Sequence, residues 1–166
     1  MAETLIVNGN QLSFHGKTYR CAIGKGGVSS TKREGDGATP LGTFSLRGCW
    51  YRADRMDAPK TQLPLRIIHE NDGWCDDPKS SDYNRHVKLP FQFSHEMLWR
   101  DDQVYDLIVP LGYNDEKPIP GKGSAIFLHL AHPDYRGTEG CIALVKQDLL
   151  ELLPHLTVKT SIAIQS

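Results

Sequence analysis

The sequence predicts a mainly β domain, a sandwich or barrel-like mixed sheet, with one principal α-helix. Short segments of alternating apolar and polar side chains recur along the chain, separated by turn signals rich in Gly, Asn, Asp and Pro, which is typical of β-strands. Only residues 146–154 carry the leucine spacing of an amphipathic helix. No repeat, low-complexity tract or interdomain linker interrupts the 166 residues. We therefore expect a single domain over residues 1–166.

The N-terminal half is predicted to contain strands joined by tight turns and one long loop. Residues 4–23 alternate, with turn signals at Asn8-Gly9 and His15-Gly16, which favours antiparallel strands. Residues 24–42 are rich in Gly, Ser and Thr and are expected to form a long, functional loop. Two further strands are predicted over residues 43–51 and 65–69.

The C-terminal half is predicted to hold the strand that leads to the reactive residues and the one clear helix. Residues 71–93 are rich in turn signals and predict loops, and residues 94–100 predict a short helix. Alternation predicts strands at 103–111, 126–129 and 156–164. The helix that begins at Lys146 is expected to end at Pro154, because proline cannot continue the helical hydrogen bonds.

Composition excludes several classes of partner. The chain has 19 basic and 20 acidic residues and a net charge of −1, so no basic surface for nucleic acid is expected. No apolar segment approaches the ~20 residues that a membrane-spanning helix needs. We expect a monomer that binds neither nucleic acid nor membrane.

The N-terminus and the cysteines predict a cytoplasmic protein. Residues 1–9 lack the basic start and long apolar core of a secretion signal; an export signal upstream of them would instead place the protein in the periplasm. The four cysteines form no closely spaced framework, and three are expected to be reduced and structural. These three are Cys21, Cys49 and Cys75.

The most reactive segment runs from His129, at the end of an apolar strand, to Cys141 twelve positions later. Cysteine is commonly a small buried hydrophobe, but Thr138, Glu139 and Gly140 form a polar turn directly before Cys141. We therefore expect Cys141 at a loop-to-helix junction, where backbone N–H groups lower the pKa of a thiol. A thiol with a base and oxyanion donors nearby can attack a carbonyl group.

Within this segment we assign Cys141 as the nucleophile and His129 as its base, since the pKa of histidine lies near neutrality. His132 competes for the role of base. The N–H groups of Gly140 and Cys141 are the expected oxyanion donors, and Tyr113 is a weaker one.

Two motifs resemble the L,D-transpeptidase (YkuD-type) catalytic domain. One is a strand ending in His129 followed by Thr138-Glu-Gly-Cys141; the other is Thr39-Pro-Leu-Gly-Thr-Phe44. They occur in the order of the family, and the resemblance extends from about residue 19 to the end of the last strand. It implies a mixed β-sandwich with one helix beside the active cysteine and a backbone carbonyl that orients the histidine. No cofactor or metal is implied.

The resemblance also implies a substrate, the peptide stem of peptidoglycan or a muropeptide. Cys141 would attack after the L-centre of meso-diaminopimelate and expel the terminal D-Ala. Two departures from the family, Glu139 where His is common and Ala143 where Arg or Asn follows the cysteine, favour water over an amine as the acceptor. The prediction is therefore an L,D-carboxypeptidase, and the alternative is a periplasmic L,D-transpeptidase that cross-links stems.

Substrate contacts are assigned from loop position and donor chemistry. They are Thr138, Glu139, His132, Tyr113, Arg52, Asn84 and Arg136. Two other functions remain open: a zinc hydrolase that binds its metal through His129, His132 and Cys141, and a wall-binding module without chemistry.

Overall fold

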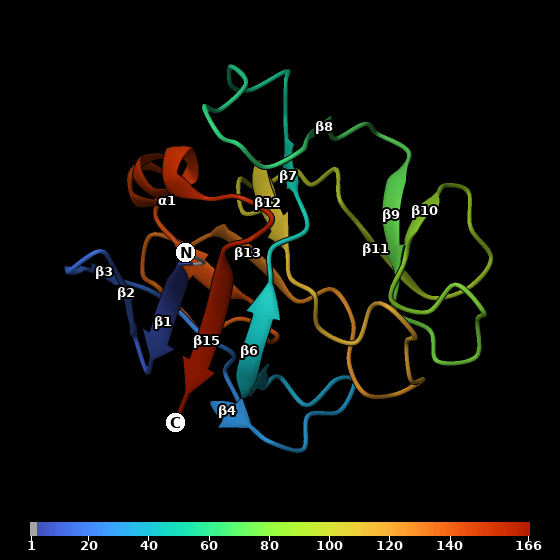
Figure 1. The fold of residues 1–166 in the computed structure, drawn as a ribbon. Helices are drawn as coiled ribbons and strands as arrows, with labels where there is room; N and C mark the ends of the chain where they lie inside the picture. The colour runs from blue at the N-terminus through green and yellow to red at the C-terminus, as the bar shows by residue number, and fades with distance from the viewer. Residues whose placement is uncertain (1–2) are drawn as a thin grey trace.

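The computed structural model describes residues 3–166. The prediction of a cytoplasmic location rests on residues 1–9, the first two of which lie outside the described residues. The structure is mainly β with a single α-helix (Figure 1), which confirms the predicted fold class. The strands form two five-stranded sheets, a three-stranded sheet and a two-stranded pair. No helix within residues 3–166 is long and apolar enough to cross a membrane.

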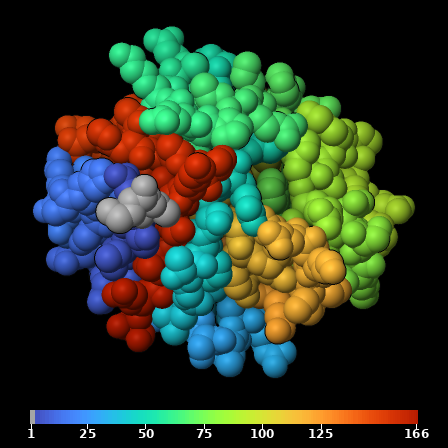
Figure 2. All heavy atoms as spheres, in the orientation of Figure 1, coloured from blue at the N-terminus to red at the C-terminus, as the bar shows by residue number. Residues whose placement is uncertain are grey.

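The first sheet joins the two ends of the chain. Two-residue turns connect its first three strands, as predicted, and positive φ at His15 (51°) and Gly16 (76°) gives the second turn the twist that matches the strands. The last strand pairs in parallel with the first, so the C-terminal segment lies against the N-terminal one (Figures 1 and 2). The order is β3 (Lys17–Arg20), β2 (Gln11–Phe14), β1 (Thr4–Asn8), β15 (Ser161–Gln165) and β6 (Gly42–Ser45).

The second sheet carries the reactive segment. Its strands β12 (Leu107–Pro110) and β13 (Phe127–Leu130) pair antiparallel. Strand β13 pairs in parallel with β14 (Ile142–Leu144). Every residue of these three strands is buried, because both faces of the sheet are covered. The order is β14 (Ile142–Leu144), β13 (Phe127–Leu130), β12 (Leu107–Pro110), β7 (Cys49–Tyr51) and β8 (Leu65–Ile67).

The main core lies between the two five-stranded sheets. Leu5 and Ile162 of the first sheet and Leu128 and Leu144 of the second belong to one buried cluster. Helix α1 (Lys146–Leu152) adds Leu149 and Leu152 to this cluster. The predicted stop at Pro154 is replaced by a 3₁₀ turn, η1 (Leu153–His155), that contains the proline in its first turn, where its missing N–H is not needed.

A three-stranded sheet replaces the predicted loops and short helix between residues 71 and 100. It consists of β10 (His86–Lys88), β9 (Asp72–Cys75) and β11 (His95–Met97). The predicted helix at 94–100 is wrong because β11 pairs with β9, placing Glu96 opposite Trp74, and this pairing overrides the weak helical preference of the segment.

Three further boundaries differ from the predictions. The loop 24–42 contains a short parallel pair, β4 (Val28–Ser29) and β5 (Thr39–Pro40). The single strand predicted at 43–51 is two strands, β6 and β7, in different sheets. The closing strand begins at Ser161 rather than 156, and the strand predicted at 103–111 is β12 alone. Alternation marks apolar segments, but pairing partners decide where a ladder ends.

A second buried cluster covers the other face of the second sheet. Phe127 and Ile108 point into it from β13 and β12, together with Tyr105 and Cys141. Trp74 packs against the cluster from the three-stranded sheet, with its ring 5.1 Å from that of Phe127. The reactive cysteine therefore lies on the face of the second sheet that is turned away from the main core.

Candidate active site

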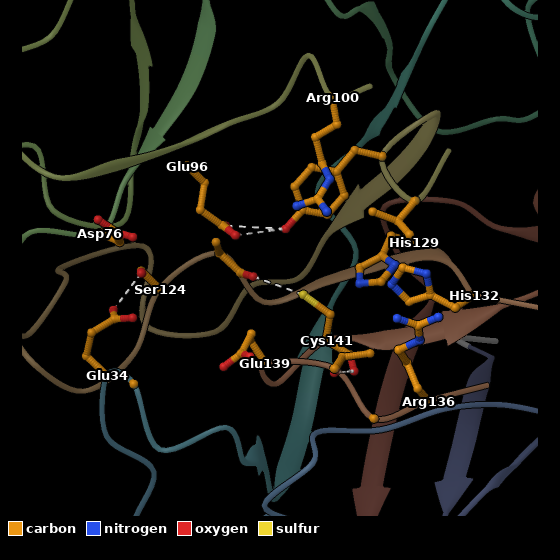
Figure 3. Close-up of a pocket in the computed structure, with 16 residues that line it drawn as sticks. Glu34, Asp76, Glu96, Arg100, Ser124, His129, His132, Arg136, Glu139 and Cys141 are labelled. Carbon is orange, nitrogen blue, oxygen red and sulfur yellow. Dashed lines mark hydrogen bonds between the residues drawn. The ribbon is translucent and has the colours of Figure 1, made fainter. Parts of the chain in front are cut away.

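A pocket of about 440 Å³ opens on this face and is lined by both Cys141 and His129. The β13–β14 register sets Leu128 opposite Ile142, and both point into the main core. Because side chains alternate along strands, Phe127, His129 and Cys141 point to the opposite face. Figure 3 shows Cys141 and His129 turned toward the same space. The tertiary structure thus brings the predicted nucleophile and base together.

The loop before Cys141 is held by its own side chains. Thr138 Oγ1 donates to the carbonyl oxygen of Cys141 (2.6 Å) and accepts from Gly140 N–H (3.1 Å). Gly140 has φ +140°, and a Cβ there would meet the carbonyl oxygen of Ala38 at 2.8 Å, so only glycine fits. Of the two predicted oxyanion donors, the N–H of Gly140 is already bonded, whereas Cys141 N–H has no acceptor among residues 3–166.

Segments from the N-terminal half clamp this loop from outside. Thr39 is completely buried; its Oγ1 donates to the carbonyl oxygen of Gly140 (2.8 Å) and accepts from Gly24 N–H (2.8 Å). The backbone of Thr138 exchanges hydrogen bonds with Ile23 and Lys25. The position of Cys141 therefore depends on residues about 100 positions earlier in the chain.

Cys141 precedes strand β14, not a helix. Helix α1 begins five residues later, at Lys146, and its buried leucines pack into the main core rather than beside the cysteine. The predicted loop-to-helix junction is therefore wrong, and no helix dipole acts on the thiol. Apolar runs do not distinguish a short buried strand from the start of a helix.

The thiol of Cys141 is neutral in the resting site. It donates to the carbonyl oxygen of Ala125 (3.1 Å) and accepts from Phe127 N–H (3.3 Å). Burial, together with the charge of Glu96, raises the pKa of the thiol to about 12. The prediction that the surroundings lower this pKa is wrong, because desolvation disfavours the thiolate more than the Phe127 N–H and the nearby Lys32 favour it.

His129 is held in the tautomer that a base requires. Its Nδ1 lies 2.9 Å from the carbonyl oxygen of Leu130. Since a carbonyl oxygen can only accept, Nδ1 carries the proton and Nε2 keeps its lone pair. This is the type of orienting carbonyl that the family resemblance implied. Burial lowers the pKa of the imidazole to about 4, so His129 is neutral at pH 7.

Acidic and basic side chains lie on opposite sides of the pair in the pocket. Figure 3 shows Glu34, Asp76 and Glu96 on one side of Cys141 and Arg100, His132 and Arg136 on the other. The three carboxylates bond to hydroxyl groups: Glu34 to Tyr83 and Ser124, Asp76 to Ser94, and Glu96 to Tyr105. These hydroxyl donors orient the three carboxyl groups, so this wall of the pocket is lined by acidic side chains.

The proposed zinc ligands do not assemble. Among residues 3–166, no three His, Cys, Asp or Glu side chains are grouped so that they could hold a metal ion. Nδ1 of His129 and the thiol hydrogen of Cys141 are directed at backbone carbonyls. The zinc hydrolase alternative therefore has no geometric support.

The sequence model of the YkuD family, described as the L,D-transpeptidase catalytic domain, matches residues 3–164. This chain belongs to the L,D-transpeptidase catalytic domain family. No curated protein matches it. Two solved structures resemble it: L,D-transpeptidase 1 of Mycobacterium tuberculosis (14% identity, TM-score 0.43, 98% of this chain and 61% of that one) and an L,D-transpeptidase from Mycobacterium smegmatis (15%, 0.43, 99% and 58%). The chain thus spans about three-fifths of the length of these proteins.

Four of the predicted substrate contacts line the pocket of this L,D-transpeptidase domain: His132, Thr138, Glu139 and Arg136. Glu139 forms an ion pair with Lys25 (2.7 Å), and Arg136 pairs with Asp134 (3.1 Å). Thr138 is committed to the loop that holds Cys141, so it positions the nucleophile.

Three predicted contacts lie elsewhere. The Tyr113 hydroxyl donates to the carbonyl oxygen of Lys122, and the guanidinium of Arg52 is stacked 3.5 Å from the ring of Trp99 and bonded to Asp54. Asn84 is buried, and its amide accepts from Ala125 N–H and donates to two backbone carbonyls. None of the three lines the pocket, so the structure gives these assignments no support and they stay predictions: loop position says little about which surface a side chain faces.

The structure adds residues that the sequence did not single out. Glu96 and Tyr105 line the pocket beside Cys141, and Ala125 accepts the thiol hydrogen. Lys32 is buried, with Nζ 3.5 Å from the place of a Cβ on Gly140. Thr39, the first residue of the Thr39–Phe44 motif, is bonded to the loop before Cys141. In the sequence, these residues are marked only by a hydroxyl or charged group next to an apolar strand. Many exposed residues share this feature, so it does not identify the site.

Proposed function

We propose that this L,D-transpeptidase-family domain is an L,D-carboxypeptidase that releases terminal D-Ala from peptidoglycan tetrapeptide stems. One observation carries the proposal: Cys141 and His129 line one pocket, with Nε2 of His129 left as the proton acceptor. The family supplies the reaction class, acyl transfer to a cysteine. A pocket of about 440 Å³ lies within the range that binds small molecules and short peptides.

The acylation step follows from the geometry. The thiol hydrogen turns from the carbonyl oxygen of Ala125 to Nε2 of His129, and Sγ of Cys141 attacks the carbonyl carbon. Cys141 N–H, which has no acceptor among residues 3–166, donates to the oxyanion. The C–N bond then breaks, His129 returns the proton to the amine of D-Ala, and a thioester remains. Because thiol and imidazole are both neutral at rest, proton transfer accompanies attack.

The second step restores the enzyme. Nε2 of His129 accepts a proton from water while the oxygen attacks the thioester carbon. The C–S bond breaks, and the proton passes to the sulfur, which regenerates the thiol. The other product is the stem with a free carboxyl group.

Two packing details support water as the acceptor. The side chain of Ala143, at the position where the family commonly has Arg or Asn, is buried with Ala22 and Ala131. Glu139, where His is common, is exposed at the pocket and pairs with Lys25. Neither residue provides a cationic or amide group that would hold an incoming amine-bearing stem. Membership of the family favours the alternative, an L,D-transpeptidase, whose acceptor is an amine. Analysis of the products therefore distinguishes water from an amine as the acceptor.

The test is mass spectrometry of a tetrapeptide stem incubated with the enzyme, with and without an amine-bearing acceptor stem. We expect D-Ala release in both reactions and no joined product. Cys141→Ala is the matched control and should release nothing. A joined product would replace the proposal with transpeptidation, and an inert protein that still retains the peptide would indicate a binding module.

A cytoplasmic location and a monomeric state remain predictions. Cell fractionation of a native host with an antibody against the chain tests the first. Recovery in the periplasmic fraction would favour the cross-linking alternative. Sedimentation of the purified protein tests the second.

A further inference from the structure

Glu96 and Tyr105 form a hydrogen-bonded pair in the pocket wall. The Tyr105 hydroxyl donates to both carboxylate oxygens of Glu96, at 3.1 and 3.3 Å. Tyr105 is only 5% exposed, so its hydroxyl depends on this partner. A lost acceptor would leave a buried donor unsatisfied.

The ring of Tyr105 touches the catalytic base. It meets the imidazole of His129 edge to face, with centroids 5.3 Å apart and planes at 69°, and it meets Phe127 at 5.8 Å. Because the hydroxyl lies on the long axis of the ring, its hydrogen bond to Glu96 fixes the direction of that axis. His129 is therefore held from two sides, by the Leu130 carbonyl at Nδ1 and by the ring of Tyr105.

Glu96 also faces the nucleophile and several other charges. Its carboxylate raises the pKa of Cys141. Burial, opposed by the Tyr105 hydrogen bond and reinforced by the charge of Asp76, raises the pKa of Glu96 itself to about 7. Arg100 acts against this shift and Glu34 adds to it. Among residues 3–166 the hydrogen-bond partner of the Glu96 carboxyl group is the Tyr105 hydroxyl and not a cation.

We propose that Glu96 is a positioning residue that acts through Tyr105: its carboxylate fixes the Tyr105 ring against His129, and its ionisation controls how firmly that ring is held. The proposal rests on the proposed acyl-transfer function and assigns a role to a residue that does not touch the reacting atoms in the steps above.

Protonation of Glu96 changes both contacts. The hydrogen bond from Tyr105 to a carboxylate is charge-assisted and about twice as strong as one to a neutral carboxyl group. At pH values above the pKa of Glu96, the ionised carboxylate holds the Tyr105 ring firmly and kcat is high. At lower pH the carboxyl group is protonated and kcat falls. His129 titrates much lower, at about 4, so an acid limb near pH 7 belongs to Glu96.

The first test compares Glu96→Gln, Glu96→Ala and Tyr105→Phe, with Glu116→Gln as a control for an exposed glutamate. Glu96→Gln keeps an acceptor for Tyr105 but cannot ionise, so kcat should lose its acid limb near pH 7. Glu96→Ala and Tyr105→Phe should each lower kcat roughly tenfold at constant KM, since small misplacements of a base cost up to a hundredfold. The double variant should be no worse than either single one. An unchanged acid limb in Glu96→Gln, or additive losses in the double variant, would overturn the proposal.

The second test does not depend on the substrate. Alkylation of Cys141 by iodoacetamide, followed by peptide mass spectrometry, reports the reactivity of the thiol directly. Alkylation depends on the acidity of the thiol and not on the placement of His129. With the Glu96 charge removed, Cys141 of Glu96→Gln should therefore be alkylated faster than in wild type at pH 8, although kcat falls. An equal rate in both proteins would contradict the role of Glu96. A protein that releases no D-Ala yet shows this difference would disprove the carboxypeptidase assignment and leave the role of Glu96 standing.

Discussion

The thiol of Cys141 donates a hydrogen bond to the backbone carbonyl oxygen of Ala125, across a distance of 3.1 Å. Ala125 has φ +54°, a left-handed conformation that costs an alanine roughly 1 kcal/mol or more. Its N–H is held by Oδ1 of Asn84 at 3.0 Å. A residue predicted to contact substrate therefore acts on the nucleophile through the backbone.

Replacement of Asn84 should disturb both stability and catalysis. Asn84→Ala removes four hydrogen bonds, to Ala125, Trp74, Tyr113 and Asn114, and places alanine at φ +57°. We expect the free energy of unfolding in urea to fall by about 2–4 kcal/mol and kcat to fall with KM nearly unchanged. The exposed Asn71→Ala is the control; equal effects of the two variants would refute this role.

Thr39 should be needed for the shape of the Cys141 loop. Thr39→Val keeps the volume but loses the bonds to Gly140 and Gly24, which leaves two buried backbone groups unsatisfied. The expected cost is about 1–3 kcal/mol for each group, with a drop in D-Ala release. Thr39→Ser keeps the hydroxyl and should restore most of the activity; failure of this rescue would show that the methyl group matters instead.

The ion pair between buried Lys32 and exposed Asp36 (2.7 Å) should stabilise the loop beneath Gly140. Burial alone would raise the pKa of Asp36, but hydrogen bonds from Lys32, Ala38 and Arg33 lower it to about 2. Asp36→Leu should destabilise by on the order of 3 kcal/mol, because the buried charge of Lys32 is left without its partner. Lys32→Met leaves the exposed Asp36 in water and should cost less. Urea unfolding of Lys32→Met, Asp36→Leu and the double variant measures the coupling. Additive single effects would show that the pair contributes nothing.

His129 should make the protein less stable in mild acid. Its pKa is about 4 when folded against 6.5 for the free side chain, so the unfolded chain binds a proton first as pH falls. The stability that neutral His129 supports is present above pH 6.5 and is lost progressively towards pH 4, by up to about 3 kcal/mol. Glu96 has the opposite slope from pH 4.5 to 7. The contribution of Glu96 is the same in wild type and in His129→Gln, so it cancels when the thermal unfolding of the two proteins is compared. His129→Gln should lose less stability than wild type between pH 6.5 and pH 4. Equal losses of stability in the two proteins would disprove the assignment.

Arg136 and Arg52 should behave differently. Arg136 lines the pocket, whereas Arg52 is buried against Trp99 and Asp54. Steady-state kinetics should show a raised KM for Arg136→Ala at nearly wild-type stability. Arg52→Ala should lower thermal stability and leave KM unchanged. A raised KM in Arg52→Ala would return this residue to the substrate site.

The three N-terminal strands and the pairing of Cys141 with His129 in one site could be predicted because both follow from local patterns. Alternation of apolar residues marks β1, β2 and β3, and a continuous apolar run marks β13. The segment from His129 to Cys141 carries its chemistry within thirteen residues. The strands β9 and β11 could not be predicted, because their segments become strands only by pairing with each other. Glu96 was missed for the same reason, since that pairing is what turns it toward the pocket.

The sequence alone determined the fold class, the family resemblance, and the candidates for nucleophile and base, because these depend on the chemistry and spacing of neighbouring residues. The tertiary structure alone decided the state of the site. Burial between two layers of sheet makes the thiol and imidazole neutral. Contacts over about 100 positions, such as Thr39 with Gly140, set where the sulfur lies. Desolvation and long-range hydrogen bonds depend on what surrounds a group in space, which no local pattern records.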